Sequence, residues 1–170
     1  MTLGSGRGVR AGPIGLARNV IKVWALMGGV SLVAVVAINV ISVVGAVVWK
    51  PFPGDFEMTE VGVAVAAFAF LPYCQLTGAN VTADIFTAGA SPRWIAGFTL
   101  LGSVIALGFS LILLRQMYLG MVDQKAFEYT TAILQFPHWI AFVPILVSLA
   151  LLAVAAAITL VENAQTMAKA

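Results

Sequence analysis

Few side chains of this sequence could do chemistry, and they lie far apart. The 170 residues include one histidine, His138, one cysteine, Cys74, and seven acidic residues. With one histidine, the chain cannot hold a haem between two histidines of its own. Cys74 and the scattered carboxylates lack the close spacing of zinc ligands. No internal disulfide can form, and no nucleophile elbow, phosphate-binding glycine loop or metalloprotease motif occurs. We therefore expect no enzyme activity, no metal and no cofactor, with His138 a polar residue at an interface.

Three polar residues beside or inside apolar runs are candidates for pairing with a cation, a partner subunit or another helix. Glu60 stands at the start of one run, where a carboxylate either pairs with a cation or a partner subunit, or is stabilised by the positive end of a helix. For Glu57, three residues earlier, the second explanation has slightly more weight than for Glu60. Asn39 lies deep in the first run and should form a hydrogen bond to another helix.

The composition indicates that lipid surrounds most of the chain. Mean hydropathy is +1.02 and 9% of residues are charged, whereas about a quarter of the residues of a soluble domain are charged. Long, continuously apolar runs form α-helices in lipid, because a helix satisfies its own backbone hydrogen bonds. The formal net charge of +2 is too small to indicate nucleic-acid binding. We expect an all-α membrane protein.

Four apolar runs predict four transmembrane helices in a single domain, residues 1–170, because each run approaches or exceeds the roughly 20 residues that span a bilayer. The predicted spans cover residues 23–49, 61–76, 94–114 and 140–161. A short polar or helical segment should separate the second and third spans. Arg115, Asp123, Lys125 and Glu128 should mark an aqueous loop, or in part a helical extension at residues 116–121.

Tryptophans and small residues suggest how these spans are anchored at the membrane interface and how they pack against other helices. Amphipathic rings prefer the headgroup level, so four residues are expected to be membrane-interface anchors: Trp24, Trp49, Trp94 and Trp139. Small residues at helical spacing predict packing surfaces. These stripes comprise Asn39, Ser42 and Ala46 in the first span, Gly62, Ala66 and Ala69 in the second, and Ala150, Ala153 and Ala157 in the fourth.

The distribution of basic residues predicts the orientation in the membrane. Cytoplasmic loops carry an excess of lysine and arginine. One side would carry Arg7, Arg10, Arg18, Lys22, Arg93 and Lys169, and the other Lys50, Arg115 and Lys125. Both termini should therefore face the cytoplasm.

Several local patterns occur in an order that is typical of one family. They are the Asn39-Val40 pair, Glu60, the Thr-Gly-Ala-Asn-Val-Thr-Ala-Asp stretch at residues 77–84, Tyr118-Leu119-Gly120, and Pro137-His138-Trp139 followed by Pro144. With the four spans and the basic N-terminus, the sequence resembles the small, DctQ-type membrane subunit of tripartite ATP-independent periplasmic (TRAP) transporters. It departs from the common pattern at residues 41–45, where many members have an arginine, and at Asn80, which stands near a position that is often histidine.

The resemblance implies a transport role without catalysis in the bacterial inner membrane. In that family a large membrane subunit carries the substrate and sodium sites, a periplasmic solute-binding protein delivers an organic acid, and the small subunit braces the large one. Five polar residues are candidates for the partner interface: Asn39, Glu60, Gln75, Asn80 and Asp84. We expect Asp84 to contribute more to assembly than Glu60, whose position at a helix start already explains it.

Two other classes remain open from the residues alone. A small tetraspan redox-associated protein would show the absorbance of a bound chromophore. A self-assembling pore would conduct ions when reconstituted alone, whereas a transporter subunit would be silent without its large partner.

Overall fold

The computed structural model describes residues 13–78 and 92–167, and within them the chain forms four long helices. These are α1 (Pro13–Val48), α2 (Asp55–Thr77), α4 (Pro92–Ala126) and α5 (Trp139–Met167). Each contains a stretch long and apolar enough to cross a membrane. The predicted all-α membrane fold is confirmed; the polar segment predicted between the second and third spans lies largely outside the described residues.

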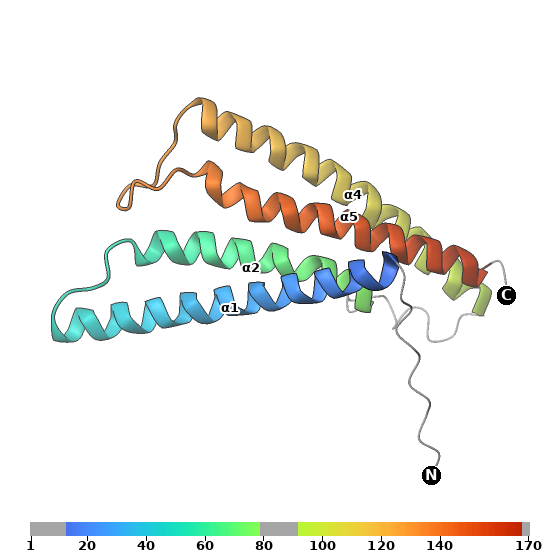
Figure 1. Cartoon of the computed structure of the whole chain (residues 1–170), viewed down its shortest axis with the longest axis horizontal. Coiled ribbons are helices and arrows are strands. Elements are labelled where there is room, and N and C mark those ends of the chain that lie inside the picture. Colours follow the sequence, from blue (N-terminus) through green and yellow to red (C-terminus); the bar gives the residue numbers. More distant parts are fainter. Residues whose placement is uncertain (1–12, 79–91, 168–170) are drawn as a thin grey trace, which may run out of the picture.

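The helices form two hairpins, α1 with α2 and α4 with α5, that meet mainly through α2 and α5. Helix α1 also contacts α5, whereas α4 packs mainly on α5. Both hairpin loops, residues 49–54 and 127–138, lie at one end of the molecule, and the start of α1 and the end of α5 lie at the other (Figure 1). We call these the loop end and the terminal end. The hairpins approach each other toward the terminal end.

Glycines shape both ends of α2. Gly54 precedes the helix with a φ of 77°, and Gly78 follows it with a φ of 65°, left-handed conformations that favour glycine. The N–H of Gly78 points at the carbonyls of Cys74 and Gln75, which closes the helix. Between these caps the helix continues through the buried Pro72.

Two helices extend well beyond their predicted spans. Helix α1 begins at Pro13, so Arg18 and Lys22 lie on it. Helix α4 continues to Ala126 and carries Arg115, Asp123 and Lys125, so the loop predicted there begins only after that residue. A hydropathy pattern marks where lipid ends, whereas a helix of good helix formers such as arginine, glutamine, methionine and lysine continues into water.

Small residues let α1 and α2 approach closely. A Cβ on Gly28 would lie 2.7 Å from the Cβ of Ala69, and a Cβ on Gly62 would lie 2.3 Å from Cγ2 of Val35. Ala66 and Ala69 are buried, as the second stripe predicted.

The predicted alanine stripe of α5 is not the most buried face of this helix within the chain. Ala150 is exposed, and the buried face of this helix instead carries Ser148, Leu149, Ala155 and Ala156. Ala46, in the first stripe, is exposed too. An alanine-rich helix contains small residues on every face, so their spacing does not select the face that packs.

Candidate functional site: polar contacts between the helices

The structure offers little for catalysis in the part of the chain that it describes. No group of three His, Cys, Asp or Glu side chains there could hold a metal ion. His138 is half-buried where α5 begins, and its backbone N–H donates to the carbonyl of Tyr129. Cys74 is a free, half-buried thiol of α2. The polar groups that do converge lie between helices, and these contacts are the candidate site.

Asn39 joins α1 to α2. Its Nδ2 donates to Oγ1 of Thr59 at 2.7 Å and to the carbonyl of Val35 at 2.9 Å. The hydroxyl of Thr59 in turn donates to the carbonyl of Asp55 at 2.7 Å. The interhelical hydrogen bond predicted for Asn39 is confirmed, and it forms a polar cross-link between α1 and α2.

Ser42 marks the level at which α2 begins. It is buried, and its hydroxyl donates to the carboxylate of Asp55 and accepts from the backbone N–H of Phe52 at 3.3 Å. The other carboxylate oxygen of Asp55 accepts from the N–H of Phe56 at 2.8 Å. The start of α2 is thereby tied to one position of α1. The sequence analysis treated Ser42 only as a small residue of a stripe.

Helix α5 forms a side-chain hydrogen bond with each of the other three helices. Nε1 of Trp24 on α1 donates to Oγ of Ser148 at 2.9 Å. Nε2 of Gln75 on α2 donates to Oγ1 of Thr159 at 3.1 Å, and Nδ2 of Asn163 donates to Oγ of Ser103 on α4 at 2.9 Å. Such bonds hold helices together where lipid supplies no hydrophobic driving force.

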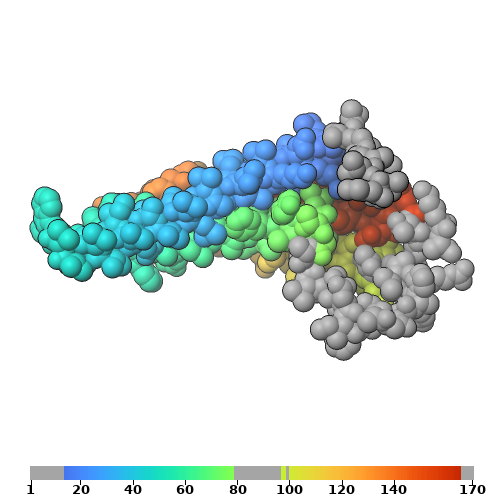
Figure 2. Space-filling view, turned by 90° about the horizontal axis from the view of Figure 1, so that it is seen from below, coloured from blue at the N-terminus to red at the C-terminus, as the bar shows by residue number. Residues whose placement is uncertain are grey.

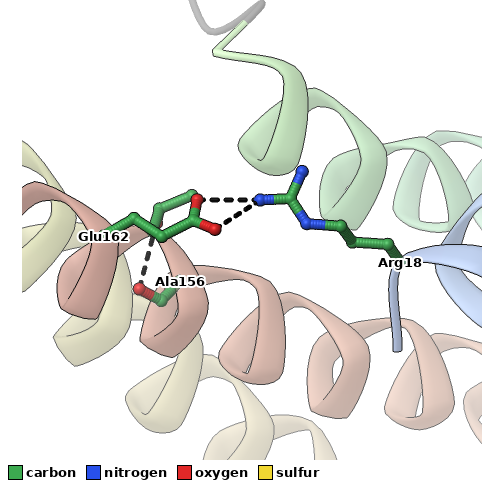
Figure 3. Close-up of polar contacts among 4 residues, drawn as sticks. Arg18, Ala156 and Glu162 are labelled. Carbon is green, nitrogen blue, oxygen red and sulfur yellow. Dashed lines mark hydrogen bonds and ion pairs between the residues drawn. The ribbon is translucent and has the colours of Figure 1, made fainter. Parts of the chain in front are cut away.

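An ion pair connects the start of α1 to the end of α5. One guanidinium nitrogen of Arg18 lies 2.7 and 2.8 Å from the two carboxylate oxygens of Glu162 (Figure 3). Both side chains are partly exposed, as expected where helices leave the hydrocarbon. The sequence analysis used Arg18 only to predict orientation, because residues 144 positions apart carry no local signal of pairing.

A single carboxylate joins the two hairpins at the loop end. Glu57 accepts hydrogen bonds from the backbone N–H groups of Ile133 at 2.7 Å and Leu134 at 3.0 Å. Leu134 also packs against Gly54, where a Cβ would lie 2.5 Å from its Cγ. The sequence analysis favoured Glu57 as a helix-start acid, so it missed this contact.

The loop that Glu57 contacts is held by its own backbone hydrogen bonds. The N–H of Thr131 donates to the carbonyl of Phe136 at 3.0 Å, and Thr131 Oγ1 accepts from the N–H of Phe136 at 3.0 Å. Glu128 and Gln135 adopt left-handed backbone conformations. At the base of the loop, the ammonium of Lys125 lies 5.2 Å from the centre of a Trp139 ring.

The predicted interface residues have different surroundings. Asn39 and Gln75 form hydrogen bonds within the chain, and Glu60 is exposed early in α2. Asn80 and Asp84 lie outside the described residues. Their role at a partner interface stays a prediction.

The predicted tryptophan anchors differ in their exposure and in their position along the helices. Trp49 is exposed just after α1, Trp139 begins α5, and Trp24 is half-buried well inside α1. Trp94 lies on α4, and its side chain is not among those that the structure describes.

Comparison with known proteins gives the family. The family model described as "Tripartite ATP-independent periplasmic transporters, DctQ component" matches residues 32–166. No curated protein and no solved structure matches significantly. The matched region includes the latter part of α1, all of α2 and α4, and α5 as far as residue 166. It excludes Arg18 and Trp24, each of which is bonded to a residue of α5. This multi-pass membrane protein therefore belongs to the DctQ family of TRAP transporter components.

Proposed function

We propose that this chain is the small scaffold subunit of a TRAP transporter and braces the large membrane subunit during uptake. One observation carries the proposal: several polar side chains inside the spans are used in contacts between this chain's own helices. Asn39, Gln75 and Ser148 all have such partners. A transport path needs polar groups that face a substrate, whereas a brace needs a rigid apolar body.

The proposal includes the partners and the orientation. The large membrane subunit would hold the substrate and sodium sites, and a periplasmic solute-binding protein would deliver an organic acid. The chain would lie in the bacterial inner membrane with both termini in the cytoplasm, so the loop end would face the periplasm. The excess of basic residues on the terminal side supports this orientation.

Reconstitution tests the proposal. Proteoliposomes with the large subunit, the binding protein and an inward sodium gradient should accumulate a labelled organic acid only when this chain is present. The chain alone should carry neither acid nor ion current. Full uptake without the chain would contradict the bracing role, and ion conduction by the chain alone would indicate a pore.

His138 provides a sharper prediction. Substituting His138→Gln should leave uptake largely unchanged, because the contact described for this residue is made by its backbone N–H. Initial uptake rates at matched expression measure this. Loss of uptake with normal assembly would show that a side chain of this subunit takes part in transport and would overturn the scaffold assignment.

A further inference from the structure

The end of α1 carries an apolar surface that projects past the start of α2. We propose that residues 43–49 and the exposed valine face leading to them form the docking surface for the large membrane subunit, an inference that rests on the proposed function. Whether this surface lies in lipid or in water is decided by where the membrane boundary crosses α1.

The length of α1 gives one estimate of that boundary. Arg18 and Lys22 lie on the first turns of the helix, where basic groups reach the headgroups. Residues 23–42 then cover about 30 Å at a rise of about 1.5 Å per residue, which equals the typical thickness of the hydrocarbon core, about 30 Å. Ser42 should therefore lie at the opposite edge of the hydrocarbon.

The contacts of Ser42 give a second, independent estimate. Ser42 is hydrogen-bonded to Asp55, and α2 continues with Glu57 and the exposed Glu60. Carboxylates in hydrocarbon are costly, so the boundary cannot lie beyond Asp55 toward the tip of α1. Both estimates place the hydrocarbon edge near Ser42.

The tip of α1 extends past this edge and is wholly apolar. Residues 43–48 add about 9 Å of helix, more than the roughly 5–8 Å of one headgroup layer. The indole N–H of Trp49 is the one polar side-chain group between Ser42 and Lys50. Val47, Val48 and Trp49 are 84%, 79% and 87% exposed. Figure 2 shows that the region at the end of α1 projects furthest from the rest of the molecule at the loop end.

Tilting does not remove the tip from water. A long apolar helix often tilts until lipid covers it. Here the same tilt would carry Asp55 below the hydrocarbon edge, because Asp55 is bonded to Ser42. An apolar protein surface covers the tip without burying that carboxylate.

The surface also continues into the membrane, which identifies the kind of partner. Val33, Val36, Val40, Val43 and Val47 are each more than half exposed, and their spacing of three and four places them on one face. Branched valine side chains are stiff, so docking them costs little conformational entropy. A partner that contacts both the embedded face and the projecting tip is itself a membrane protein, as the large subunit is.

Spin labelling tests this assignment. A nitroxide is placed at Val47→Cys in a Cys74→Ser background, in nanodiscs, and its exposure to water-soluble nickel and to lipid-soluble oxygen is measured. In the chain alone the label should be open to nickel. Adding the large membrane subunit should protect it, while a matched label at the exposed Phe127→Cys on the other hairpin stays open.

Substitution gives the second measurement. Val47→Asn should reduce co-purification with the large subunit about tenfold, the effect expected of a residue central to an interface. Phe127→Asn should leave it unchanged. Because Val47 is 84% exposed, the substituted chain should keep the wild-type helical circular dichroism.

Each contrary outcome has its own meaning. A label open to oxygen but not nickel in the chain alone means that lipid covers the tip, and the inference is wrong. A complex that forms while the Val47 label stays open, or protection by the soluble binding protein instead, also overturns the docking surface but leaves the scaffold role intact. Failure of the wild-type chain to bind the large subunit at all would instead contradict the proposed function.

Discussion

At the scale of single residues, several polar side chains inside the spans join one helix to another. Asn39, Trp24 and Gln75 each donate to a hydroxyl on another helix. The hydroxyls of Thr59, Ser148 and Thr159 each donate onward to a carbonyl of their own helix. Each hydroxyl therefore both accepts and donates, so these cross-links leave little unsatisfied polarity in lipid.

Asn39 and Thr59 should be energetically coupled. Asn39→Val and Thr59→Val should each lower the free energy of unfolding, and a double-mutant cycle should give a coupling of roughly 0.5–1.5 kcal/mol, as for other hydrogen bonds between membrane helices. Unfolding in mixed micelles measures it. Strictly additive effects of the two substitutions would show that the bond contributes nothing to stability.

At the scale of elements, close approach of α1 and α2 depends on where small residues face. Gly28 and Gly29 are neighbours in sequence, but only Gly28 lies against α2. A Cβ on Gly28 would meet Ala69, whereas a Cβ on Gly29 would meet nothing within 4 Å. The pair therefore separates a packing requirement from the general effect of a glycine on helix stability.

Gly28→Val should weaken the α1–α2 contact, and Gly29→Val should not. Overpacking of this kind costs roughly 1–3 kcal/mol, because the helices must separate to admit the side chain. Thermal unfolding of both variants, followed by circular dichroism, provides the comparison. Equal loss of stability in the two variants would argue against the close contact at Gly28.

At the scale of the whole molecule, contacts at both ends connect the two hairpins. The ion pair of Arg18 and Glu162 connects them at the terminal end, and Glu57 connects them at the loop end. The first is partly exposed, and such pairs contribute at most about 1 kcal/mol in water. Glu57 instead accepts two charge-assisted bonds from backbone groups, which are typically stronger.

Glu57→Gln should loosen the loop from α2. In the glutamine an NH2 group, which cannot accept a hydrogen bond, replaces one of the two carboxylate oxygens that accept from the loop, so one of the two bonds is lost in this geometry. Amide exchange at Ile133 and Leu134 should become faster, because opening of the loop then breaks fewer charge-assisted hydrogen bonds. Glu60→Gln, one turn away on the exposed surface, is the control. Unchanged protection in Glu57→Gln would show that the loop is held by other contacts.

The sequence alone determined the four helices, the membrane class, the family and the bonding of Asn39, because each follows from a strong local signal. A long apolar run can only be a helix in lipid, and an amide inside it must find a partner. Tertiary structure alone decided which face of each helix packs. It also decided that Arg18 pairs with Glu162 and that Glu57 accepts hydrogen bonds from the loop at Ile133 and Leu134. In lipid the packed and the exposed faces of a helix are both mainly apolar. Hydropathy therefore does not separate them, as the exposed valine face of α1 and the exposed Ala150 of the α5 stripe both show.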